Sequence, residues 1–232
     1  MTALAGGDLE ESVRRADPDR WLASRFIADP AHRMATLAIL AFDLELARAS
    51  LVTSSSLAAQ IRLTWWREAI DEIAGGGQPR AHPVAKALAG AVELGLDLNW
   101  LHEAIDARIT VLDEPPLQPQ AAIAFADGAA GSIAVASGRL LDAQADVAAL
   151  KSGGRVIGLD RLRRSRPESA ETLSPLVRQA LSSARADARR LKPLALPAVL
   201  AAALARAPLR LGPWTGVDRR IRLLAAMASG RL

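Results

Sequence analysis

The strongest helical signal in the sequence lies in residues 56–74, which read SLAAQIRLTWWREAIDEIA. Apolar residues recur there at every fourth position, a spacing that places them on one face of a helix. They are Leu57, Ile61, Trp65, Ala69 and Ile73. Residues 54–56 supply capping serines before the stretch, and three consecutive glycines, residues 75–77, end it. The pattern therefore predicts an amphipathic helix that is bounded at both ends.

Similar signals predict helices along the rest of the chain. Asp17-Pro18 and Asp29-Pro30 each combine an N-cap residue with a proline in the first turn. The expected helices are 18–27, 30–50, 83–94, 98–112, 120–142, 145–164 with an interruption at 153–154, 171–191, 197–206 and 217–228. No strand-like alternation persists long enough to compete. We expect an all-α, single-domain bundle of about ten helices over residues 17–232, after a flexible N-terminus at residues 1–16.

Composition supports this fold class and narrows the chemistry. Half of the 232 residues are hydrophobic, and Ala and Leu, which dominate that half, lose little entropy in a helix. The chain has no Cys and three His. Disulfides and thiolate chemistry are therefore excluded, and a multi-histidine metal site is not expected.

The charge balance leaves the choice of partner open. The formal net charge is +4, and arginine supplies nearly all of the basic residues. Such an excess suits phosphate, anionic lipid or an acidic protein, and equally a solvated surface without a partner. The densest basic run consists of Arg161, Arg163, Arg164 and Arg166. It is open to the same two interpretations, because it could bind an anionic surface or form a solvated helix end. No nucleic-acid-binding module accompanies the charge, so we expect no nucleic-acid partner.

Targeting signals are also absent from the sequence. Its first residues lack the basic and apolar regions of a signal peptide, and no uninterrupted apolar run reaches the ~18–20 residues that span a bilayer. The expectation is a cytoplasmic protein, with peripheral contact at the inner membrane left open. The sequence does not indicate an oligomeric state.

Three segments, in order, resemble a known family. The first comprises Asp17-Pro-Asp-Arg-Trp-Leu22 and Leu40-Ala-Phe-Asp-Leu-Glu-Leu-Ala-Arg48, the second is Ile61-Arg-Leu-Thr-Trp-Trp-Arg-Glu-Ala-Ile-Asp71, and the third is Ile105-Asp-Ala-Arg108 with Ala130-Gly131. Together they are similar to the squalene/phytoene synthases, whose isoprenoid-synthase-like fold is an all-α bundle. The likeness is greatest to a divergent branch that includes a mitochondrial assembly factor for respiratory complex I.

The resemblance implies a chemistry that depends on aspartates. Catalytic members join two prenyl diphosphates head to head, and two aspartate-rich motifs hold the Mg²⁺ ions that bridge the departing phosphates. The positions that match the first motif are Ala47, Arg48 and Leu51. Arg48 places a cation where a metal ligand is expected.

The second motif matches residues 161–169. In catalytic members it resembles Asn-x-x-Arg-Asp-x-x-Glu-Asp, whereas here Arg161 stands at the Asn position and Ser165 and Ser169 stand at the two Asp positions. Arg164 and Glu168 persist. The resemblance thus implies that the aspartates of both motifs have been lost and that no metal is bound.

Several polar residues remain candidates for an inherited cavity or ligand site. They are Asp43, Glu45, Arg48, Arg62, Trp66, Asp71, Asp106, Arg108, Arg164 and Glu168. The simpler interpretation of those on residues 61–71 is a solvated helix face, with Arg67 and Asp71 paired at i, i+4. Of the two adjacent tryptophans, we expect Trp65 to be buried and Trp66 to face a ligand or partner.

These observations favour a non-catalytic binding or assembly factor, with complex I as the partner that the resemblance suggests. One alternative is an active, Mg²⁺-dependent prenyl-diphosphate transferase with an altered metal site that uses Asp43, Glu45, Asp106 or Glu168. Another is a protein that binds a prenyl lipid without reacting. Magnesium would be a cofactor only for the enzyme.

Overall fold

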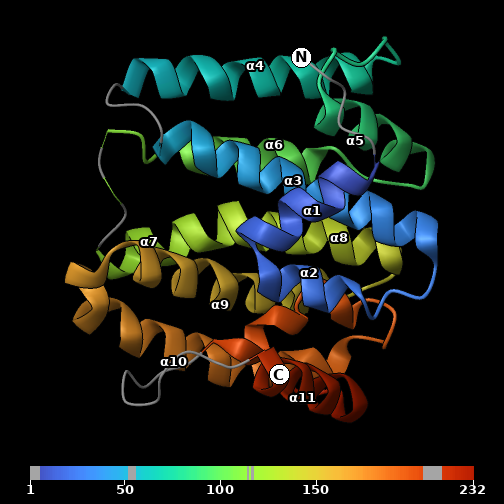
Figure 1. The fold of residues 1–232 in the computed structure, drawn as a ribbon. Coiled ribbons are helices and arrows are strands. Elements are labelled where there is room, and N and C mark those ends of the chain that lie inside the picture. The colour runs from blue at the N-terminus through green and yellow to red at the C-terminus, as the bar shows by residue number, and fades with distance from the viewer. Residues whose placement is uncertain (1–5, 52–55, 114, 116–117, 206–215) are drawn as a thin grey trace.

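The computed structural model describes residues 6–51, 56–113, 115, 118–205 and 216–232 as one bundle of helices (Figure 1). The α-helices are α1 (Gly6–Ala16), α2 (Pro18–Ser24), α3 (Pro30–Leu51), α4 (Ser56–Ala74), α5 (Pro83–Glu93), α6 (Asn99–Ile109), α7 (Pro119–Ala126), α8 (Ser132–Leu141), α9 (Val147–Ser165), α10 (Ala170–Asp187) and α11 (Gly216–Ser229). A π-helical turn, η1 (Asp127–Gly131), joins α7 and α8 into one helix. With that helix counted once, the described residues form ten α-helices and contain no strand, so the predicted fold class is confirmed.

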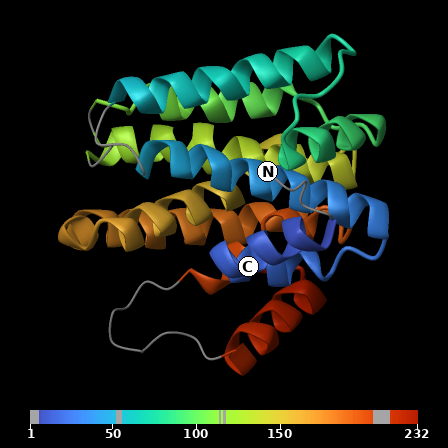
Figure 2. The ribbon, with the colours of Figure 1, turned by 45° about the horizontal axis from the view of Figure 1, so that its top comes forward.

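The helices are stacked between α4 at one end of the bundle and α11 at the other (Figures 1 and 2). Helix α4 packs on α3 and α6, which in turn pack on α8. Helix α8 packs on α9, and α9 packs on α10. Helix α8 therefore contacts helices on both sides of the stack.

Local sequence signals explain several helix ends. The side chain of Asp17 accepts a hydrogen bond from the backbone N–H of Arg20 at 3.1 Å, and Pro18 occupies the first turn of α2. His82 caps α5 in the same way, because its Nδ1 accepts from the backbone N–H of Val84 at 3.3 Å. Gly76, with φ of 71°, adopts the left-handed conformation just after α4, which glycine reaches without steric cost.

The N-terminal segment differs from its prediction. Residues 6–16, expected to be loosely ordered, form helix α1. Leu9 and Val13 lie one helical turn apart, and they are 4% and 0% exposed because they pack in the core against α3. The segment is short and acidic, and these two apolar residues alone were too weak a signal to predict a helix.

Helix α4 buries only the last two residues of the predicted stripe, Ala69 and Ile73. Leu57 and Ile61 are exposed, whereas the stripe that packs inward consists of Ala59, Leu63, Trp66, Ala69, Ile70 and Ile73. The prediction for the tryptophans was also wrong: Trp66 is 4% exposed, and its ring makes an edge contact with Phe42 at 5.3 Å between ring centroids. Trp65 is only half-buried and lies beneath the guanidinium of Arg80.

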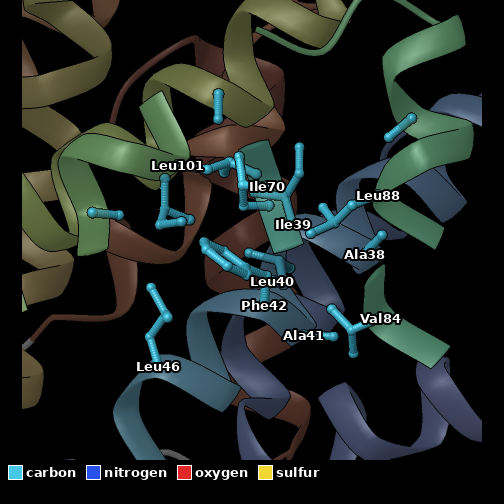
Figure 3. Close-up of a cluster of buried hydrophobic side chains, with 14 of the residues drawn as sticks. Ala38, Ile39, Leu40, Ala41, Phe42, Leu46, Ile70, Val84, Leu88 and Leu101 are labelled. Atoms are coloured by element: carbon cyan, nitrogen blue, oxygen red, sulfur yellow. The ribbon is translucent and has the colours of Figure 1, made fainter. Parts of the chain in front are cut away.

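Two apolar clusters form the core. One gathers side chains of α1, α3, α4, α5, α6 and α8, and Figure 3 shows its centre, where Ile39, Phe42, Ile70, Leu88 and Leu101 converge from α3 to α6. The other lies among α2 and α7 to α11. Helix α8 contributes Ile133 to the first cluster and Val135 to the second. The two halves therefore meet along this helix.

Helix α9 continues without the interruption expected at its glycine pair. Gly153 and Gly154 are buried inside Val147–Ser165. A Cβ atom on Gly154 would lie 2.6 Å from the Cα atom of Gly131, so the residue is small because another helix backbone passes against it. The glycine pair is a close-packing site rather than a helix end.

Two later segments are less regular than predicted. The helix expected at 171–191 ends at Asp187 and continues as the short 3-10 helix η3 (Ala188–Arg190). The helix expected at 197–206 is replaced by the 3-10 helices η4 (Leu196–Ala198) and η5 (Leu200–Leu204), and residue 206 lies outside the described residues.

One continuous helix, Pro119–Leu141, is long and apolar enough to cross a membrane by length and composition. Its most apolar window is 67% buried inside the bundle, as is common for the core helix of a folded domain. This feature is accordingly weak support for a membrane span.

Candidate functional site

A fully buried carboxylate, Asp43 of α3, is surrounded by three arginines. Arg20 Nη2 donates to Asp43 Oδ2 at 2.5 Å, and Arg161 Nη1 donates to the same oxygen at 2.7 Å. Arg108 Nη2 donates to Asp43 Oδ1. The three guanidiniums come from α2, α9 and α6, so this one carboxylate connects four helices.

A second buried carboxylate, Asp17, shares two of these arginines. Its Oδ2 accepts from Arg20 Nε at 2.6 Å and from Arg161 Nη2 at 2.8 Å. Its Oδ1 accepts from the backbone N–H of Arg20. We call the five residues Asp17, Arg20, Asp43, Arg108 and Arg161 the buried ion cluster. It lies where helices of the first apolar cluster, α3 and α6, meet α2 and α9 of the second.

The electrostatics of the buried ion cluster favour the charged state of its carboxylates. Burial by itself would raise the pKa of Asp43, but the positive charges of Arg20, Arg161 and Arg108 outweigh it and hold the pKa well below its usual range. The pKa of Asp17 is lowered for the same reason: Arg20 and Arg161 overcome the effect of burial. Burial lowers the pKa of the Arg108 guanidinium, yet arginine stays protonated at neutral pH.

A pocket of about 390 Å³ opens beside the buried ion cluster. Residues from the start of α2, the C-terminal half of α9, η5 and α11 line it: Ala16, Asp17, Pro18, Asp19, Arg20, Ile157, Asp160, Arg161, Arg164, Ser165, Ala201, Ala205 and Arg219. Four arginines and three aspartates in this lining give it a net charge of +1. The lining therefore mixes charged and apolar groups, with a slight positive excess.

The charged groups of this pocket are also paired with one another. Asp160 is buried and contacts Arg163 at 2.6 Å as well as Arg164. Asp19 lies 3.3 Å from Arg219 Nε and 3.6 Å from Arg164 Nη1, but its Oδ1 has no hydrogen-bond partner. Burial raises the pKa of Asp19 because these looser contacts do not fully offset desolvation.

The remaining predicted carboxylates do not join this site. Glu45 pairs with Arg48 at 2.6 Å on α3 itself, and Glu168 lies 3.9 Å from Arg166 with its side chain 62% exposed. The four carboxylates proposed for an altered metal site therefore have separate arginine partners; they are Asp43, Glu45, Asp106, which pairs with Arg67, and Glu168.

The candidate residues on α4 and α6 form ion pairs at the surface and do not line the pocket. Arg67 pairs with Asp106, and Asp71 lies 3.2 Å from His102 Nε2. The pairing of Arg67 with Asp71 that the sequence suggested is therefore not among the contacts of these two residues. Arg62 is exposed on α4.

The positions that match the aspartate motifs have mixed surroundings. Ala47 and Ser169 are half-buried, whereas Arg48 is exposed and Leu51 ends α3 with a side chain outside what the structure describes. Ser165 is exposed, lines the pocket and donates its hydroxyl to the carbonyl of Leu162 at 2.9 Å.

Sequence reasoning did not propose several charged residues of the site, among them Asp17, Asp19, Arg20, Asp160 and Arg219. For Arg20 a signal was present, because Asp17 and Arg20 stand at i, i+3 at a helix start and can therefore meet. Asp160 and Arg219 have no comparable local signal. Whether they reach the pocket depends on how α9 and α11 are rotated about their axes.

A model of the squalene/phytoene synthase family matches residues 13–172, more than half of the chain. The chain belongs to the squalene/phytoene synthase family. A solved structure described as a dehydrosqualene synthase in complex with ligand shares the fold: the TM-score is 0.72 at 13% identity, over 97% of this chain and 95% of that chain. No curated protein sequence matches the chain.

Magnesium, which the resemblance implies for catalytic members of the family, does not fit the carboxylates of the buried ion cluster. Mg²⁺ requires oxygen ligands in near-octahedral geometry. Both oxygens of Asp43 already accept from guanidiniums, and Asp17 is engaged by Arg20 and Arg161. Among the described residues, no three His, Cys, Asp or Glu side chains gather where they could hold a metal ion. Arginines therefore hold the carboxylates of the buried ion cluster.

Proposed function

We propose that this chain is a non-catalytic member of the squalene/phytoene synthase family that acts by binding, as a ligand carrier or an assembly factor. The observation that supports it is the buried ion cluster, in which Asp43 is neutralised by Arg20, Arg108 and Arg161. A metal ion would have to displace the guanidiniums of Arg20, Arg108 and Arg161 from Asp43. Arg108, which is buried and has Asp43 as its carboxylate partner, would then lose that partner at a cost of several kcal/mol.

Loss of the metal ions should lower the catalytic rate by more than the loss of any single residue. Removing one well-placed electrostatic group typically lowers a rate by ~10²–10³. Loss of the metal ions removes the groups that stabilise the departing diphosphate, so little remains to drive ionisation of a prenyl diphosphate.

The test is incubation of the purified chain with farnesyl or geranylgeranyl diphosphate and Mg²⁺, with an active dehydrosqualene synthase in parallel as the positive control. We expect product from the control enzyme and none from this chain. Robust turnover that EDTA abolishes would overturn the proposal and restore the alternative of an active prenyltransferase.

A binding role has support of its own in the pocket beside the buried ion cluster. Its arginines exceed its aspartates by one, and Arg164 is 52% exposed at its edge, so an anionic head group would be attracted there without a metal. We expect farnesyl diphosphate to bind in the presence of EDTA, as measured by calorimetry. Arg164→Gln should weaken this binding, whereas Arg67→Gln, on a surface pair far from the pocket lining, should not.

The more specific role, assembly of respiratory complex I, rests on the sequence resemblance alone. Its test is deletion of the gene in the source cell, followed by native gel analysis of complex I. Impaired assembly that the intact chain rescues is the expected result. Normal assembly would remove this role while leaving the non-catalytic proposal in place.

A further inference from the structure

Asp19, in the first turn of α2, brings an incompletely paired carboxylate to the pocket beside the buried ion cluster. Its side chain is 15% exposed, and its buried Oδ1 atom has no hydrogen-bond partner. Arg219 Nε of α11 lies 3.3 Å from this oxygen and is also buried without a hydrogen-bond partner. Buried polar atoms in proteins are nearly always hydrogen-bonded, so an unused acceptor beside an unused donor indicates a place for a ligand group that supplies both partners.

The second oxygen of Asp19 is also paired loosely. Its Oδ2 lies 3.6 Å from Arg164 Nη1, which is beyond hydrogen-bonding distance, and Arg164 makes its closer contact with Asp160. Asp17, two residues earlier, differs because its Oδ2 accepts from Arg20 Nε at 2.6 Å. The arginines of the pocket therefore neutralise Asp19 less completely than they neutralise Asp17.

The charged groups around Asp19 come from three helices. Those in the pocket lining are Asp17 and Arg20 at the start of α2, Asp160, Arg161 and Arg164 on α9, and Arg219 on α11. The end of α1 and the segment that includes η5 contribute Ala16, Ala201 and Ala205 to the lining. Burial raises the pKa of Asp19 in this setting, and an anion bound beside it would raise the pKa further, because a second negative charge disfavours the ionised carboxylate.

A phosphate oxygen that carries a proton satisfies both unused atoms. The oxygen accepts from Arg219 Nε, and its hydrogen is donated to Asp19 Oδ1. The charge balance points the same way, because a phosphate group carries about −1.5 to −2 at neutral pH, whereas the net charge of the pocket lining is only +1. A fully ionised phosphate would also place its oxygens against the carboxylate of Asp19. Uptake of one proton removes this repulsion.

We infer that the pocket binds a phosphate head group together with one proton from solvent, which lies between Asp19 Oδ1 and a phosphate oxygen. The inference rests on the proposed binding role and adds a regulation to it. The complex holds more protons than the free pocket and the free ligand, so the affinity must rise as the pH falls, by at most about tenfold per pH unit for one proton. Alkaline conditions therefore favour release of the ligand.

The experiment is titration calorimetry of the full chain with farnesyl diphosphate and EDTA, between about pH 5.5 and about pH 8. Paired buffers with different ionisation enthalpies give the number of protons taken up for each ligand bound. We expect the parent chain to take up more protons than Asp19→Asn, by up to one, and its affinity to rise more steeply as the pH falls. The ligand's own titration is common to both proteins, so the difference between them reports on Asp19.

The variants also differ in affinity at the alkaline end of this range. Asp19→Asn should bind at least about fivefold more tightly than the parent chain there, because a like charge at roughly 4 Å weakens binding by about that factor even in water. The matched control is Asp106→Asn, which removes one negative charge from α6, outside the pocket lining, and should behave like the parent chain. Asp19→Ser, which lacks both the charge and the amide, should lose the additional proton uptake as well.

The outcomes separate this inference from the proposed function. Equal proton uptake by the parent chain and both Asp19 variants, with farnesyl diphosphate bound by all three, would overturn the inference and leave the binding role in place. Absence of binding by the parent chain at every pH would remove the binding role and the inference with it. Circular dichroism melts of each variant confirm that a change in proton uptake comes from a folded chain.

Discussion

Replacement of Asp43 by asparagine tests whether the buried ion cluster is structural. Asp43→Asn keeps the shape of the side chain but removes the negative charge on which Arg20, Arg108 and Arg161 converge. Asp17 then remains as the partner of Arg20 and Arg161, while the buried guanidinium of Arg108 loses its carboxylate partner. Removing one partner of a buried ion pair typically costs about 3–5 kcal/mol, so we expect a loss of that size in the free energy of unfolding.

The assay is thermal and urea unfolding followed by circular dichroism. For a chain of this length, 1 kcal/mol corresponds to about 2–4 °C, so the melting temperature should fall by roughly 10 °C. The control is Asp106→Asn, whose carboxylate is 58% exposed and pairs only with Arg67. An exposed pair contributes about 0–1 kcal/mol, so this variant should remain close to the parent chain.

The pH dependence supplies a second readout. The folded-state pKa of Asp43 lies below its unfolded value, near 3.9, so the unfolded state binds more protons in that range. Its contribution is therefore complete at neutral pH and is lost as the pH falls below about 5 toward the folded pKa. The gap in stability between the parent chain and Asp43→Asn should narrow over this window.

Two results would refute this reasoning. If Asp43→Asn were as stable as the parent chain, or more stable, the carboxylate would be a strained functional group of the kind that a metal site holds. If the gap in stability stayed constant between neutral and acid pH, the loss would come from packing and not from charge.

Two further predictions concern packing. Gly154→Ala should lower stability by about 1–3 kcal/mol, because its Cβ would meet the backbone of a neighbouring helix, whereas Gly90→Ala, in the open on α5, should raise it by about 0.5–1 kcal/mol in the same urea titration. Trp66→Ala should cost about 3–5 kcal/mol and Trp65→Ala clearly less, because only the first is buried in the core; equal losses in thermal melts would contradict this assignment.

Much of the helical architecture is predictable because its signals are local. An N-cap followed by proline starts α2, and glycines with positive φ follow α4 and α5. The buried face of α4 was not predictable in the same way, because two apolar stripes run along that helix. The stripe through Leu57 and Ile61 fits a helix as well as the one through Leu63 and Trp66, and only packing against α3 and α6 decides between them.

The candidate site was less predictable because its contacts span the chain. Arg161 is 118 residues from Asp43 and 144 residues from Asp17, and neither separation leaves a local pattern. The family resemblance indicated Asp43 and Arg108 as separate candidates but gave no reason to expect an ion pair between them. Residues such as Glu45 and Glu168 were plausible on charge alone, yet each lies beside an arginine close to it in sequence.

The arginines of the buried ion cluster also constrain how such a chain could regain a metal site. Aspartates at the positions of Ser165 and Ser169 would add carboxylates near the end of α9, where Ser165 is exposed. Asp43 would still hold its guanidiniums in a fully buried setting, and a metal ion could recruit it only by displacing them and leaving the buried charge of Arg108 without its carboxylate partner. Catalysis would therefore require loss of Arg20, Arg108 or Arg161 as well, and each loss would first weaken the contacts that join α2, α3, α6 and α9. Under the proposed function, the arginines that hold these helices together also compete with a metal ion for the carboxylate of Asp43.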